Sequence, residues 1–141
     1  MRFWDSSAIL PLFIEEPTRE RLMARLEDDA DMLSWWGTPV EIASALARRE
    51  REKLLTAEEV SSILAALHQL AASWHEIVPS DAVRRSAERL LRTHTLRAAD
   101  SLQLAAALVA ADHDPGSLEI VCLDERLTLA ARREGFTVLG A

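Results

Sequence analysis

Asp5, Glu41, Asp100 and Asp124 are the residues whose types and positions could perform chemistry together. Asp5 and Asp124 each follow a short apolar run, and Glu41 and Asp100 fall near the starts of segments with helical periodicity. Strand ends and helix starts of these kinds meet at one edge of a parallel sheet. Four carboxylates gathered there repel one another, and a hard divalent cation such as Mg²⁺ or Mn²⁺ would resolve that repulsion.

Each acid also has a simpler structural interpretation. Asp5 precedes two serines and could form an Asx turn, while Asp124 could cap a helix. Glu41 could complete a capping box that begins at Thr38, and Asp100 could favour a helix dipole. Taken singly, these structural roles are preferred, and only the joint placement of the four acids favours a metal site.

Other catalytic classes fit the chain less well. None of the four histidines stands in a context that suggests a Ser-His-Asp set. A phosphotransferase of the haloacid-dehalogenase type needs a second Asp two residues after the first, and Ser7 stands there. A receiver domain needs a lysine late in the chain, and the only lysine is Lys53. Both of these alternatives are therefore disfavoured.

The elements that must position the acids alternate along the chain. Short apolar runs predict strands at residues 2–4, 32–36, 76–78, 120–123 and 136–139. Helical periodicity predicts helices at residues 18–26, 38–53, 56–74, 80–91, 98–111 and 125–133. Such alternation implies right-handed crossovers and a mainly parallel sheet with helices on both faces. The expected fold is a three-layer α/β/α domain.

Local signals mark several helix ends. Thr38 and Thr56 each precede a glutamate by three residues, which predicts two capping boxes. Gly135 is expected as the glycine that ends the last helix. The segment 98–111 is apolar almost all round, so we expect it to be an inner helix.

Length and composition bound the class of protein. The 141 residues contain no Gly/Pro-rich linker, which predicts a single domain over 1–141. One cysteine, Cys122, excludes an intrachain disulfide framework and, together with the lack of a signal peptide, favours a cytoplasmic protein. The longest stretch without charged residues, 60–75, is too short to cross a bilayer. The net charge of −7 suits a metal or a basic peptide better than bulk nucleic-acid binding.

Four segments, each containing one of the acids, resemble the motifs of PIN domains. They are residues 5–10 (DSSAIL), 38–46 (TPVEIASAL), 96–107 (LRAADSLQLAAA) and 122–127 (CLDERL). The resemblance covers the whole chain, in order, at the length of VapC-type toxins. It implies a PIN fold, a Mg²⁺- or Mn²⁺-dependent endoribonuclease, a cognate antitoxin that inhibits it, and a homodimer. A PIN-fold protein that binds RNA without cutting it is the alternative.

The resemblance also implies roles for particular residues. By position, Asp5, Glu41, Asp100 and Asp124 match the four metal-site acids of the family. We interpret the three aspartates as metal ligands, and Glu41 as either a ligand or the carboxylate that orients the attacking water. Ser7 matches a small polar residue that supports the first acid.

Two positions depart from the family pattern. Cys122 stands where many relatives have Thr or Ser, so a hydrogen bond that supports the site is expected to be weaker. Gln103 stands where His is common, and we expect this change to be tolerated. Neither departure removes an acid, so the interpretation as an active enzyme stands.

Charged partners are expected on two grounds. Four arginines close together in sequence could track an RNA backbone or form a solvated helix face: Arg84, Arg85, Arg89 and Arg92. The acidic site in a chain of net negative charge predicts that the antitoxin inhibits through a basic segment.

Overall fold

A computed structural model describes residues 1–140. Five short strands form one sheet: β1 (Arg2–Trp4), β2 (Met32–Trp35), β3 (His75–Ile77), β4 (Glu119–Val121) and β5 (Thr137–Leu139). The order across the sheet is β3-β2-β1-β4-β5, and every neighbouring pair is parallel. The predicted parallel sheet is therefore confirmed, with each strand within a residue or two of its expected bounds.

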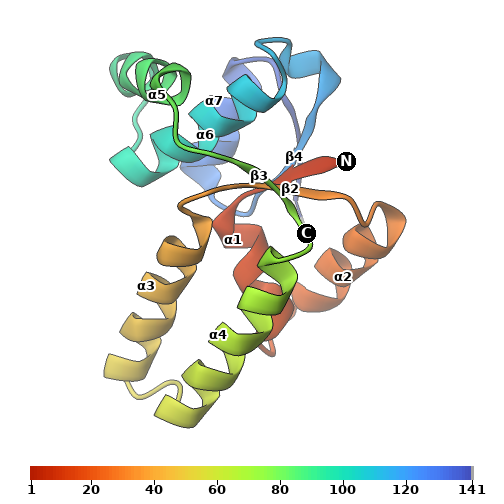
Figure 1. Ribbon diagram of the computed structural model, residues 1–141, viewed down its shortest axis with the longest axis vertical. Coiled ribbons are helices and arrows are strands. Elements are labelled where there is room, and N and C mark those ends of the chain that lie inside the picture. Colours follow the sequence, from red (N-terminus) through yellow and green to blue (C-terminus); the bar gives the residue numbers. More distant parts are fainter. Residues whose placement is uncertain (141) are drawn as a thin grey trace.

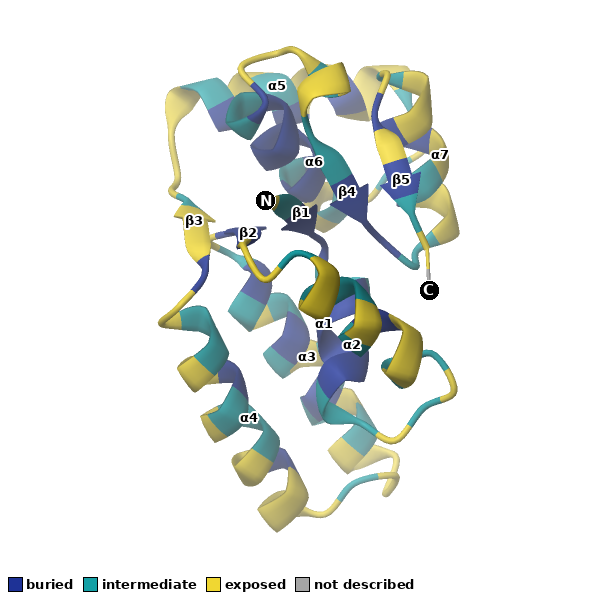
Figure 2. Ribbon diagram, turned by 90° about the vertical axis from the view of Figure 1, so that its right-hand side faces the viewer, coloured by how far each residue is buried: buried dark blue, intermediate teal, exposed yellow. Residues whose placement is uncertain are grey.

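Helices cover both faces of the sheet (Figures 1 and 2). One face carries α1 (Ser6–Ile9), α2 (Arg19–Asp28), α3 (Thr38–Arg51) and α4 (Ala57–Ala71), and the other carries α5 (Asp81–Thr93), α6 (Ala98–Ala110) and α7 (Glu125–Arg133). Short 3-10 turns lie at Leu10–Phe13 and Pro115–Ser117. Because successive strand residues point to opposite faces, Phe3 packs in the core under α5–α7 and Trp4 in the core under α1–α4. The three-layer α/β/α architecture is confirmed.

The helix starts show one correct and one wrong capping prediction. At α4, Thr56 Oγ1 accepts a hydrogen bond from the Glu59 amide, and the Glu59 carboxylate accepts one from the Thr56 amide, as a capping box requires. At α3 the expected box is absent: the N-cap is Gly37, and no side chain caps the helix. The Thr38 hydroxyl is buried and accepts hydrogen bonds from other side chains, so it is unavailable to its own helix.

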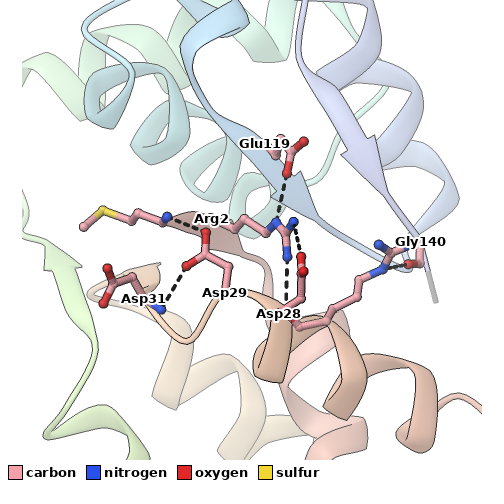
Figure 3. A network of polar contacts seen from close by, with 8 residues as sticks. Arg2, Asp28, Asp29, Asp31, Glu119 and Gly140 are labelled. Carbon is pink, nitrogen blue, oxygen red and sulfur yellow. Dashed lines mark hydrogen bonds and ion pairs between the residues drawn. The ribbon is translucent and has the colours of Figure 1, made fainter.

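The amino edge of the sheet is held by a network around Arg2 (Figure 3). Its guanidinium donates to Glu119 of β4 and to Asp28 of α2, both at 2.8 Å, and to the Arg25 carbonyl at 3.1 Å. Arg25 in turn donates to the Gly140 carbonyl. These contacts tie the amino ends of β1 and β4 to α2, and α2 in turn to the residue that follows β5.

The sheet order contains a topological switch point, where the direction in which strands are added reverses, between the central strand β1 and its neighbour β4. The chain runs outward from β1 to β2 and β3, then returns to the other side of β1 for β4 and β5. In open parallel sheets ligands bind at the carboxyl ends of the strands on either side of such a point. The residues that follow β1 and β4 are therefore where a site is expected. No helix within residues 1–140 has both the length and the apolar character that a membrane span requires.

Candidate active site

A pocket of about 770 Å³ opens at the carboxyl edge of the sheet. Its walls come from the starts of α1, α3, α6 and α7, and four acids line it: Glu41, Asp100, Asp124 and Glu125. Asp5 does not line the pocket but lies beside it, with only 2% of its surface exposed. The four acids singled out from the sequence thus share one neighbourhood at the predicted edge.

The aspartates that follow β1 and β4 begin the next helices. Asp5 is the N-cap of α1 and accepts a hydrogen bond from the Ser7 amide at 3.0 Å. Asp124 is the N-cap of α7 and accepts one from the Leu127 amide at 2.8 Å. Capping fixes each carboxylate but uses only part of its acceptor capacity. The structural role of these residues is therefore compatible with a chemical one.

Glu41 lies in the first turn of α3, between α1 and α6. One of its carboxylate oxygens accepts a hydrogen bond from Ser6 Oγ at 3.2 Å, and the other accepts one from Gln103 Nε2 at 2.8 Å. Burial raises the pKa of Glu41 to about 7, and repulsion from Asp5 and Asp100 adds to the rise. The two hydrogen bonds oppose that rise because they stabilise the charged form. Glu41 is thus poised to exchange a proton near neutral pH.

The aspartates are affected by the same neighbourhood. Burial raises the pKa of Asp5, and repulsion from Asp100 and Asp124 acts in the same direction. Burial and then repulsion from Asp124 raise the pKa of Asp100. Within residues 1–140, no three histidine, cysteine, aspartate or glutamate side chains already stand together as a ready-made metal-binding group. The acids therefore repel one another, but their side chains are not already arranged as the ligands of a metal ion.

Ser7 connects the first helix to the turn that carries Asp124. Its hydroxyl oxygen accepts hydrogen bonds from the backbone amides of Leu123 at 2.9 Å and Asp124 at 3.2 Å. Cys122 Sγ lies 3.7 Å from both the Ser7 hydroxyl and an Asp5 carboxylate oxygen. A thiol is a weak donor at this distance, so the contact supports Asp5 less than a hydroxyl would.

Gln103, noted in the sequence only as a departure from the family pattern, contacts the candidate site. It lies on the buried helix α6 with no exposed surface, and its Nε2 donates to both Glu41 and Thr38 Oγ1. Its Oε1 is buried without a hydrogen-bond partner among the described residues. Its position within the third motif is one signal, and a second is that an amide in a largely apolar helix needs polar partners when it is buried.

The arginines predicted to bind RNA lie on α5 and do not line the acidic pocket: Arg84, Arg85, Arg89 and Arg92. Arg84 pairs with Asp81 at 3.6 Å, and Arg89 pairs with Glu134 at 2.6 Å. The cations that do line the pocket come from other elements: Arg48, Arg97 and Arg126.

The layers, the sheet order and the acidic pocket define a protein of the PIN-like α/β class. Among solved structures, FitAcB from Neisseria gonorrhoeae superposes with a TM-score of 0.68 at 20% identity, covering 99% of this chain and 96% of that one. A toxin–antitoxin complex from Klebsiella pneumoniae gives a TM-score of 0.64 at 14% identity, covering 91% and 90%. Both likenesses concern the fold.

Sequence comparison gives the family. Ribonuclease VapC45 and Ribonuclease VapC49, from two strains of Mycobacterium tuberculosis, are each 33% identical to this chain over 141 residues. The matches cover 99% of this chain and 94% of each relative. No family model matches the chain. The chain belongs to the VapC family of ribonuclease toxins.

Proposed function

We propose that this protein is an endoribonuclease that hydrolyses RNA phosphodiesters at the acidic pocket with the help of Mg²⁺ or Mn²⁺. The observation that carries the proposal is the meeting of Asp5, Glu41, Asp100 and Asp124 at the switch point of the sheet. An all-carboxylate donor set suits a hard divalent cation. Asp5, Asp100 and Asp124 would hold the ion, whose charge would offset their mutual repulsion.

Glu41 and Ser7 have separate roles beside the three aspartates. A bound divalent cation would lower the pKa of water and neutralise charge that builds on the phosphate. Glu41, with its pKa near neutrality, orients the attacking water and can accept its proton. Ser7 accepts hydrogen bonds from the backbone amides of Leu123 and Asp124, and so fixes the position of Asp124 relative to Asp5.

The direct test is cleavage of labelled RNA with and without Mg²⁺ or Mn²⁺. Asp5→Asn, Asp100→Asn and Asp124→Asn are each expected to abolish cleavage while the protein stays folded. Glu125→Gln is the matched control, because Glu125 lines the same pocket but is exposed and has no assigned role. Wild-type protein that binds RNA but cuts none with either ion supports the alternative, a PIN-fold RNA-binding protein.

We also propose a cognate antitoxin that inhibits through a basic segment, and a homodimeric state. The acidic pocket and the net charge of −7 favour a cationic partner. An arginine fork can pair with two carboxylate oxygens at once. The similar fold occurs in a solved toxin–antitoxin complex, which supports an antitoxin here. Light scattering on the purified protein tests the dimer.

A further inference from the structure

Three arginines of the acidic pocket have no anionic partner within residues 1–140. Arg48, Arg97 and Arg126 line the pocket, and none of them forms an ion pair or a side-chain hydrogen bond among the described residues. Among the other arginines, Arg2, Arg19, Arg49, Arg84 and Arg89 each pair with a carboxylate, whereas exposed arginines such as Arg21 and Arg85 are also unpaired but lie outside this pocket. The guanidinium groups beside the pocket are thus available to an external anion.

Each of these arginines lies near an acid on the same element. Arg48 follows Glu41 by seven residues on α3, so the two share one face about 10 Å apart along the helix axis. Arg97 is the N-cap of α6, three residues before Asp100. Arg126 lies in the first turn of α7, two residues after the N-cap Asp124. The cations therefore border the carboxylates on three walls of the pocket.

The arginines do not cancel the charge of the acids. Arg97 and Arg126 lower the pKa of Asp100, but burial and the charge of Asp124 outweigh them, and its pKa is raised overall. Arg48 is exposed and forms no ion pair with a carboxylate among the described residues. Counter-charge for the acids is therefore an incomplete explanation of three arginines at one pocket.

We propose that Arg48, Arg97 and Arg126 bind the phosphates that flank the scissile phosphate of a single-stranded RNA. The RNA backbone would run from the pocket wall formed by α6 and α7, across the carboxylates, and along the face of α3 that carries Glu41 and Arg48. Guanidinium forks match phosphate oxygens, and contacts with backbone phosphates give affinity without regard to sequence. This inference rests on the proposed function for the identity of the ligand. It also gives a chain of net charge −7 a local means to hold a polyanion.

The test measures binding of a fluorescein-labelled single-stranded RNA by anisotropy at several salt concentrations. Arg48→Gln, Arg97→Gln and Arg126→Gln are compared in a Glu41→Gln background with Mg²⁺ present, so that cleavage does not interfere. Each change is expected to reduce the slope of log K against log salt by about 0.7, the value for one single-strand phosphate contact. In the active protein the same changes should raise KM and leave kcat nearly unchanged.

Two controls separate contact from general charge. Arg21→Gln removes an exposed arginine from α2, outside the pocket, and is expected to leave the slope unchanged. Arg85→Gln tests the α5 arginines predicted from the sequence. An effect of Arg85→Gln larger than that of the pocket variants, or an equal effect of Arg21→Gln, would overturn the proposed path.

The triple variant and the wild-type protein separate the proposed RNA contacts from the proposed ribonuclease activity. A folded triple variant that keeps the wild-type salt slope and KM shows that the path is wrong, while wild-type cleavage leaves the ribonuclease proposal intact. Variants that lose thermal stability but keep RNA affinity show that the arginines only balance the acids. Wild-type protein that neither binds nor cuts RNA contradicts the proposed function itself.

Discussion

Gln103 of α6 donates a hydrogen bond of 2.8 Å from Nε2 to the carboxylate of Glu41 on α3. The same nitrogen donates to Thr38 Oγ1 at 2.9 Å, and Thr38 Oγ1 also accepts from Ser34 Oγ of β2 at 3.0 Å. Ser34, Thr38 and Gln103 are all fully buried. A chain of polar side chains thus runs through the interior from β2 to a carboxylate of the pocket and fixes its orientation.

Removing this donor should shift the pH dependence of cleavage. Gln103→Leu deletes a hydrogen bond that favours the charged form of Glu41, so the pKa of Glu41 should rise above its present value of about 7. The acidic limb of kcat/KM against pH should then move to higher pH. Gln103→His keeps an N–H donor and should restore most of the wild-type profile. An unchanged acidic limb in a folded Gln103→Leu protein contradicts this role.

Glu41 should also make stability depend on pH in the absence of metal. Its pKa rises from 4.5 to about 7 on folding, so the folded chain binds more protons than the unfolded chain between these values. The free energy of unfolding should therefore fall as pH rises through this window. Glu41→Gln removes the penalty and should stabilise the protein by about 1–2 kcal/mol at pH 8, after allowance for solvent screening, and very little at pH 4. Thermal unfolding in EDTA at both pH values measures the difference.

Asp5 combines a helix cap with a buried charge, and two substitutions separate these roles. Asp5→Asn keeps an oxygen for the Ser7 amide and removes the charge, so stability in EDTA should be equal to or above wild type. Asp5→Ala also removes the cap, which should cost about 1 kcal/mol relative to Asp5→Asn. Both variants should be inactive on RNA. A clear loss of thermal stability in Asp5→Asn would mean that the charged form itself is structural.

Cys122 should be unreactive in the folded protein. Burial raises the pKa of its thiol to about 12, with repulsion from Asp5 acting in the same direction, and the residue is 2% exposed. Since the thiolate is the nucleophile, a thiol reagent should label Cys122 slowly at pH 8 and quickly after denaturation. Rapid labelling of the native protein would show that the turn before α7 opens readily.

Metal and antitoxin should compete if the antitoxin acts through the acidic pocket. Saturating Mn²⁺ should weaken a preformed toxin–antitoxin complex, and so should Asp100→Asn, because both remove negative charge from the site. Association should slow as salt rises, since the field that steers a cationic segment is screened. Antitoxin affinity that responds to neither Mn²⁺ nor Asp100→Asn would favour a steric block at the apolar segment of residues 10–14 instead.

Local sequence determined most of the elements and the candidate acids. Apolar runs gave the strands, because a central strand buried on both faces needs apolar side chains in succession. The capping box at Thr56 and the glycine that ends α7, Gly135 with φ of +105°, follow from contacts within a few residues. Asp5 and Asp124 could be placed at the edge because a strand end is itself a local feature.

The tertiary structure decided what depends on partners distant in the chain. Thr38 does not cap its own helix, because Ser34 and Gln103 engage its hydroxyl in the interior, and no local pattern reports such a partner. The strand order, the pairing of Gln103 with Glu41 and the gathering of three arginines around the acids likewise join residues far apart in sequence. Local propensity specifies which element a segment forms. Only packing across the sheet specifies which side chains meet, because most buried polar groups must find a partner that is near in space, wherever that partner lies along the chain.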